Sequence, residues 1–172
     1  MTILVFIISG CEQTRQKVVE LASPDGNIVV KVSSGGSQLS YEVLYKGIVV
    51  ITDSPMGVTI DDVDAGKNAE ITGEQYIEEN SSYPWVGIHD TIINHFKGAM
   101  VTLKHPVFNT FYLNLRVFND GVAFACTIPG SGERTVQGEP TGFKLAEGST
   151  VWYHNWYMHY ETEHVRKEIG GV

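Results

Sequence analysis

The stretch "LNLRVFNDGVAFACTIPG", residues 113–130, constrains the fold more than any other part of the chain. Two apolar runs, 113–118 and 122–128, flank Asn119-Asp120-Gly121. Apolar residues alternate in both runs: Leu113, Leu115 and Val117, then Val122, Phe124, Cys126 and Ile128. A period of two predicts strands with one buried face. Gly121 tolerates a positive φ, so the three residues between the runs predict a tight hairpin connection.

Other short runs repeat this pattern along the chain. Residues 28–32, 39–45 and 48–51 resemble strands separated by turn residues, and a further strand is expected around 100–103. Residues 61–94 have weak periodicity and predict an irregular segment, and the end of the chain predicts a frayed helix or the start of a loop. No segment longer than a turn or two has helical spacing. The sequence therefore indicates an all-β fold.

Composition limits the class of partner. The 172 residues suffice for one ordinary domain, and 42% hydrophobic with 19% charged residues is typical of a globular chain. The formal net charge is −8 and the lysines and arginines are scattered. Because a nucleic-acid site needs a basic stripe, we expect no nucleic-acid partner.

The N-terminus, "MTILVFIISGC", resembles a bacterial lipoprotein signal. Its apolar run is too short to span a bilayer, and small residues precede Cys11. We therefore expect residues 1–10 to be a signal remnant, Cys11 to carry a lipid that anchors the protein to a membrane of the cell envelope, and residues 11–21 to form a tether. No Lys or Arg precedes the apolar run, which suggests a basic segment lost from the start. A buried first strand with an incidental Cys11 is the alternative.

Metal and thiol patterns are weak. If Cys11 is lipidated, Cys126 has no disulfide partner and is expected to be a small buried hydrophobe. No zinc pattern is present. Asp61-Asp62-x-Asp64 begins like a calcium loop, but Lys67 and Gly73 occupy the sixth and twelfth positions counted from Asp62, so we expect a solvated loop.

Several segments in order resemble one family. They are "SPDGNIVVKV", "LSYEVLYKGIVVITDSPMGVTI", "NHFKGAMVTL", "LNLRVFNDGVAFACTIPG" and "GEPTGFKLAEGSTVWYHN". Together, over about residues 22–165, they resemble the N-terminal domain of glycoside hydrolase family 97, whose members are α-glucosidases and α-galactosidases. The resemblance implies an antiparallel β-supersandwich of the galactose-mutarotase type over residues 22–172, and an incomplete one, because the family's sandwich is longer.

The same resemblance implies where the chemistry lies. In this family the catalytic carboxylates belong to a (β/α)₈ barrel, which these residues cannot form. The sandwich contributes one carboxylate to a calcium ion shared with that barrel, so calcium is expected only in the intact enzyme. The stretch ending "HYE" makes Glu161 the candidate ligand and Glu163 the second. A surface acid is the simpler interpretation of Glu161, because calcium needs six to eight oxygen ligands.

Aromatic residues near the C-terminus are candidates for sugar contacts. Strand alternation places Trp152 and Trp156 on one face and Tyr153 and Tyr157 on the other. Trp152 and Trp156 are the candidate substrate-binding residues, since sugar rings stack on aromatic planes, although aromatics at this spacing also serve packing. The nearby histidines are expected to be interfacial or exposed.

Three hypotheses follow. The first is a non-catalytic sandwich that walls the active site of an α-glycosidase whose barrel is absent here, with an α-linked glycan as ligand and no catalytic residue on this chain. The second is a free-standing glycan-binding lipoprotein of the envelope. The third is a structural or adhesive sandwich without a ligand.

Overall fold

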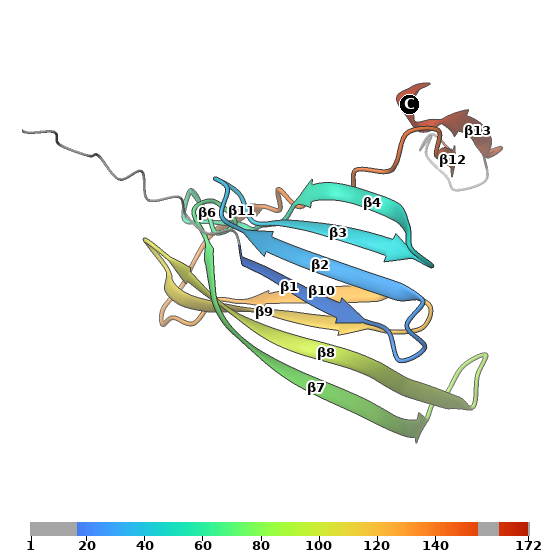
Figure 1. The fold of residues 1–172 in the computed structure, drawn as a ribbon, viewed down its shortest axis with the longest axis horizontal. Helices are drawn as coiled ribbons and strands as arrows, with labels where there is room; N and C mark the ends of the chain where they lie inside the picture. The colour runs from blue at the N-terminus through green and yellow to red at the C-terminus, as the bar shows by residue number, and fades with distance from the viewer. Residues whose placement is uncertain (1–16, 155–161, 172) are drawn as a thin grey trace, which may run out of the picture.

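The computed structural model describes residues 17–154 and 162–171, and within them strands predominate. Two four-stranded antiparallel sheets lie face to face (Figure 1). The strand orders are β1-β2-β3-β4 and β10-β9-β8-β7. This arrangement confirms the predicted all-β, antiparallel sandwich.

The first sheet is a meander of four neighbouring strands. Its strands are β1 (Lys17–Ala22), β2 (Ile28–Ser34), β3 (Ser40–Tyr45) and β4 (Ile48–Pro55). Their apolar residues alternate between the core and the outer face: in β2, Val30 and Val32 are buried, whereas Val29 and Lys31 are half-buried. The sequence expectation for β2, β3 and β4 is confirmed. The tether expected over residues 11–21 is wrong for residues 17–21, because they belong to β1 and bury Val19 and Leu21.

The second sheet contains the hairpin that the sequence predicted. Its strands are β7 (Glu70–Pro84), β8 (Thr91–His105), β9 (Asn109–Val117) and β10 (Val122–Thr127). β9 and β10 pair antiparallel as the predicted hairpin, and Leu113, Leu115 and Val117 are buried. The turn is closed by a 2.8 Å bond from the Phe118 N–H to the Gly121 carbonyl. Gly121 does not have a positive φ, so the expected reason for a glycine there is wrong.

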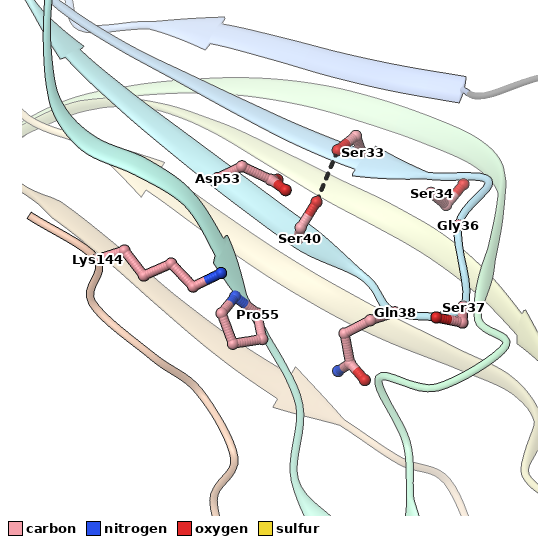
Figure 2. A pocket seen from close by; sticks show the side chains of 9 residues that line it. All are labelled: Ser33, Ser34, Gly36, Ser37, Gln38, Ser40, Asp53, Pro55 and Lys144. Carbon is pink, nitrogen blue, oxygen red and sulfur yellow. Dashed lines mark hydrogen bonds between the residues drawn. The ribbon is translucent and has the colours of Figure 1, made fainter. Parts of the chain in front are cut away.

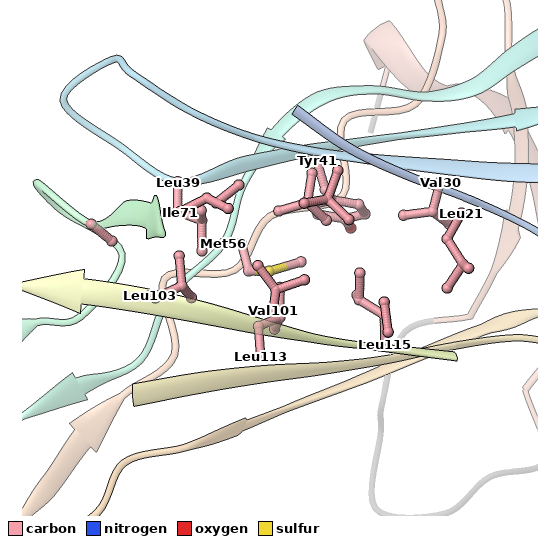
Figure 3. Packing of buried hydrophobic residues seen from close by; sticks show 14 of the residues in the cluster. Leu21, Val30, Leu39, Tyr41, Met56, Ile71, Val101, Leu103, Leu113 and Leu115 are labelled. Carbon is pink, nitrogen blue, oxygen red and sulfur yellow. The ribbon is translucent and has the colours of Figure 1, made fainter. Parts of the chain in front are cut away.

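The core lies between the two sheets. Figure 3 shows Tyr41, Leu39 and Val30 of the first sheet facing Val101, Leu103, Leu113 and Leu115 of the second, with Met56 between them. All of these side chains are at most 2% exposed. Burial of apolar surface on this scale is the main driving force for the fold.

The irregular segment expected over residues 61–94 is wrong for most of its length. The irregular segment expected there contains all of β7, which pairs with β8 from Glu70↔Lys104 to Pro84↔Thr91. The last pair between β8 and β9 is Lys97↔Val117, so the hairpin projects beyond β9, as Figure 1 shows. Apart from Phe96, which is buried and packs on Phe118, the projecting part is largely exposed on both faces. The alternation that marks a half-buried strand is therefore missing.

Short elements complete the description. β5 (Thr59–Ile60), β6 (Val63–Asp64) and β11 (Val136–Gly138) form a small sheet, and β12 (Thr150–Tyr153) pairs with β13 (Val165–Glu168). A 3₁₀ turn, η1 (Ile169–Gly171), follows β13. Instead of the frayed helix or loop start expected at this end, the structure has a strand and a single 3₁₀ turn. No helix within the described ranges is long and apolar enough to cross a bilayer.

Candidate functional site

The β12–β13 hairpin presents the aromatic residue that the sequence singled out. Trp152 pairs with Arg166 across the hairpin and is 66% exposed, whereas Tyr153 is half-buried and lies 5.7 Å from the Lys167 ammonium group. Alternation thus separates these two rings as expected. The Trp152 ring is free to contact a planar or ring-shaped ligand.

The other candidate residues of this region are placed less completely. Trp156 and Glu161, like Cys11, lie outside the described residues, whereas Glu163 is exposed. His154 and His164 stack with ring centroids 5.0 Å apart, and His154 Nδ1 is buried without a hydrogen-bond partner. Among the described residues, no three His, Cys, Asp or Glu side chains gather as a metal site.

A polar cavity of about 350 Å³ lies on the outer side of the first sheet, at the end of β2 and β3 (Figure 2). Ser33 and Ser40 point toward one another with hydroxyl oxygens 2.9 Å apart. Asp53 of β4 lies beside them, and Lys144 reaches the cavity from the coil before β12. This set offers hydroxyl, carboxylate and ammonium groups to a polar ligand.

Hydrogen bonds hold the frame of this cavity. The Lys144 N–H donates to Ser54 Oγ at 2.9 Å, and Thr52 N–H donates to the Lys144 carbonyl at 2.8 Å. On the opposite side, Gln38 Nε2 donates to the Met56 carbonyl at 3.1 Å. Lys144 is therefore hydrogen-bonded to Thr52 and Ser54, about 90 positions earlier in the chain, at the edge of the cavity. No local pattern in the sequence could have indicated this meeting of β4 and the later coil.

The cavity can bind but lacks the groups for glycoside hydrolysis. Asp53 is the one carboxylate among the residues that line it. Hydrolysis of a glycosidic bond uses two carboxyl groups on opposite sides of the bond, one as acid and one as base or nucleophile. A single carboxylate can accept hydrogen bonds from hydroxyl groups but cannot fill both roles.

Cys126 differs from its expected state. The strand pattern predicted a buried thiol, whereas the residue is exposed. β10 is an edge strand, and the inner face at its end borders an open cavity of about 370 Å³ shared with Val136 and Glu139. Desolvation by the surrounding residues, with a smaller contribution from the charge of Glu139, raises the pKa of the Cys126 thiol. A raised pKa lowers the thiolate fraction, so Cys126 is a poor nucleophile.

The tip of the β7–β8 hairpin is an apolar surface that the sequence analysis did not identify. Val86 is 99% and Ile88 100% exposed, and Trp85 and Ile93 are also exposed. Tyr83 packs edge-on against Trp85 with centroids 6.3 Å apart. Large exposed apolar patches are found at protein–protein and membrane contacts and at ligand grooves.

Comparison with known proteins shows which family the sequence matches. The sequence matches the glycosyl-hydrolase 97 N-terminal family over residues 21–172. It is 27% identical over 125 residues to the retaining alpha-galactosidase of Bacteroides thetaiotaomicron. The aligned region covers 71% of this chain and 18% of that protein.

Solved structures agree on the fold. A Glycoside Hydrolase Family 97 enzyme from Pseudoalteromonas sp. strain K8, in complex with acarbose, aligns with a TM-score of 0.78 and 23% identity over 87% of this chain and 24% of that chain. A beta-arabinopyranosidase aligns with a TM-score of 0.75 and 24% identity over 86% of this chain and 26% of that chain. At this identity the likeness establishes the fold alone. The chain spans about a quarter of the length of these structures.

Proposed function

The chain belongs to the glycosyl-hydrolase 97 N-terminal family, and from that premise we propose that it is the non-catalytic sandwich of an α-glycosidase, walling an active site that a (β/α)₈ barrel outside these residues completes. The family match over residues 21–172 carries the proposal. The small share of each relative that the chain covers supports it, because most of a relative's polypeptide has no counterpart here.

The distribution of carboxylates supports a non-catalytic role. The polar cavity of Figure 2 has only Asp53. Asp62 and Asp64 do line one cavity, but they come from a single turn, two residues apart. Both therefore approach a ligand from the same wall, whereas an acid and its partner flank the scissile bond.

The exposed apolar tip of the β7–β8 hairpin supports a partner within the same protein. Val86 and Ile88 are almost wholly exposed at the end of a hairpin that projects from the sandwich. The missing barrel is the occupant that we propose for this tip. Contact with the barrel would remove these side chains from water and hold the sandwich beside the active site.

An α-linked glycan is the proposed ligand, in keeping with the alpha-galactosidase among the relatives. Trp152 is exposed on β12 and is the proposed stacking contact, together with Trp156. Cys11 is the proposed lipid attachment site, which would hold the protein at a membrane of the cell envelope.

Calcium is proposed only for the intact enzyme. The described residues contain no group of three or more Asp, Glu, His or Cys side chains placed so that they could hold a metal ion, and Glu161 lies outside them. This part of the chain therefore does not form a calcium shell by itself, since the ion takes six to eight oxygen ligands. We assign Glu161 at most one of those ligands, and no step of the reaction depends on it here.

Hydrolysis assays on the 172-residue chain test the proposal. We expect no release of p-nitrophenol from its α-galactoside or α-glucoside, while a full-length family 97 enzyme in the same assay is active. Release that disappears in an Asp62→Asn or Asp64→Asn variant would show that this chain carries its own catalytic carboxylates. The proposal would then be wrong.

A free-standing glycan-binding protein is the second candidate. The exposure of Trp152 and the hydroxyl-lined cavity of Figure 2 favour it, because both suit a saccharide without any barrel. Saturable quenching of tryptophan fluorescence by maltooligosaccharides would support capture by this chain alone. Its absence would favour the sandwich that works only beside a barrel.

A further inference from the structure

A second cavity, of about 580 Å³, opens between the turn that joins β5 to β6 and the turn that follows β8. Its volume is within the range of about 300–1,000 Å³ that is typical of ligand pockets. Asp62, Asp64 and Asn68 of the β5–β6 region and His105 with Pro106 at the end of β8 all line it. The sequence analysis considered Asp62 and Asp64 as the start of a calcium loop and expected a solvated loop instead, and it did not single out His105 or Asn68.

His105 is held in one orientation by its neighbours. It is 5% exposed, stacks on Phe108 with centroids 5.0 Å apart, and meets Phe111 edge-on. Its Nδ1 accepts the N–H of Val107 at 3.1 Å and that of Phe108 at 3.3 Å. An acceptor at Nδ1 requires that the neutral ring carry its proton on Nε2.

The Nε2–H of His105 has no partner among the described residues, yet it is not sealed from solvent. The one fully buried side-chain polar atom without a partner in those residues is His154 Nδ1. Nε2 of His105 is therefore not fully buried, and His105 is one of the residues that line the cavity. Side-chain donors of largely buried residues rarely lack a hydrogen-bond partner, and a ligand or an ordered water usually accepts from them.

Other residues that line the cavity supply acceptors. Asp64 uses Oδ1 to accept the Gly66 N–H at 2.9 Å, which leaves Oδ2 free. Asp62 and Asn68 make no side-chain hydrogen bond to the described residues. Both have positive φ, 63° and 55°, so their side chains are presented from left-handed turns that are closed by backbone bonds.

We propose that this cavity is a saccharide-binding site in which His105 Nε2–H donates to one hydroxyl group while Asp62 and Asn68 bind its neighbours. Two carboxylates and the one ammonium group of Lys67 give the lining a net charge of −1, which disfavours anionic ligands. A histidine donor and several oxygen acceptors in one cavity, together with the apolar rings of Pro106 and Pro140, suit the hydroxyl groups and C–H faces of a neutral sugar.

The site is additional to the proposed function and does not depend on it. It uses neither Trp152 nor the exposed tip of the β7–β8 hairpin, and it needs no barrel. A chain that binds saccharide here but hydrolyses none would support both proposals. Hydrolysis by the isolated chain would contradict only the first.

Nuclear magnetic resonance of the His105 ring in the 172-residue chain tests the site. Long-range ¹H–¹⁵N spectra should show the Nε2–H tautomer in the free protein. Titration with D-glucose, D-galactose or maltotriose should then shift the ring signals saturably. Inorganic phosphate, added in a separate titration, should shift them less than the sugars do.

Glycine variants test the acceptors and also supply the control, because glycine adopts the positive φ of the residues that it replaces without strain. Asp62→Gly and Asn68→Gly remove the acceptors and should each weaken sugar binding by about tenfold, the effect of losing one good hydrogen bond. Lys46→Gly, at φ 50° on the β3–β4 turn, should change nothing. The proposal is wrong if no sugar shifts the His105 signals, if phosphate binds better, or if both variants bind as the wild type does.

Discussion

The phenolic hydroxyl of Tyr41 donates a 2.9 Å hydrogen bond to the carbonyl oxygen of Gly142, 101 residues later in the chain. The ring is 2% exposed and lies 5.6 Å from the Phe124 ring and 6.2 Å from that of Phe143. One side chain of β3 therefore connects the first sheet to β10 and to the coil before β12. Burial also raises the pKa of the phenol, so the hydroxyl keeps its proton at physiological pH.

Tyr41→Phe should lower the free energy of unfolding by about 1 kcal/mol, because the Gly142 carbonyl loses its donor while the ring remains packed. Urea denaturation followed by circular dichroism measures the change. Tyr45→Phe, at an exposed tyrosine of the same strand, is the control and should have almost no effect. Equal midpoints for wild type and Tyr41→Phe would mean that the bond contributes nothing.

Gly66→Ala should destabilise the fold by at least about 2 kcal/mol, since overpacking of a tight site forces the backbone to move. A Cβ at Gly66 would overlap the carbonyl oxygen of Met56 and press on the Gln38 amide. Gly121→Ala is the matched control, because a Cβ there meets nothing within 4 Å and φ is not positive. Thermal unfolding of both variants checks the contrast, which fails if the two melt alike.

Asp25 should contribute stability that disappears in acid. The hydroxyl of Ser23 and the backbone N–H of Asn27 both donate to this carboxylate and hold its pKa below the ordinary value of 3.8. A lowered folded-state pKa adds stability above about pH 4 that is lost as pH falls through the folded value. Urea midpoints between pH 2 and 5 should therefore fall more steeply for the wild type than for Asp25→Asn. Parallel curves would contradict this.

Cys126 should react slowly with iodoacetamide near neutral pH. Its raised pKa leaves less thiolate than an ordinary cysteine has. Glu139→Gln removes the smaller, electrostatic cause and should speed the reaction modestly. Mass spectrometry on a Cys11→Ser background follows this single thiol, and an unchanged rate in Glu139→Gln would exclude the charge effect.

Trp152→Ala should abolish any quenching of tryptophan fluorescence by maltotriose, if that quenching arises from stacking on the exposed indole of β12. Trp85→Ala is the control, because Trp85 is similarly exposed, at 58% against 66%, but lies on the other hairpin. Quenching that survives in Trp152→Ala and disappears in Trp85→Ala would reassign the sugar contact to the β7–β8 tip.

The length of β7 shows where apolar alternation in the sequence fails to predict a strand. The strands in residues 113–128 were predicted correctly because one face of β9 is buried and Val122 and Phe124 of β10 are partly buried against the same core. Burial of one face gives a period of two. Glu78 and Asn80 belong to an equally regular strand, but both sides of the hairpin meet solvent there, so no alternation was selected. This part of β7 is held as a strand by its antiparallel pairing with β8, which the local sequence of β7 does not reveal.

The sequence alone determined the fold class and the paired strands β9 and β10, because alternating apolar residues and turn chemistry are local properties. The resemblance of several sequence segments to glycoside hydrolase family 97 indicated the family. Only the tertiary structure decided that Cys126 is exposed on an edge strand, that Lys144 joins Ser33 and Ser40 at one cavity, and that His105, Asp62 and Asn68 line another. These outcomes depend on which strands become neighbours. That choice is made by the packing of two sheets, which brings together residues that are distant in the chain and leaves no trace in the spacing of either segment.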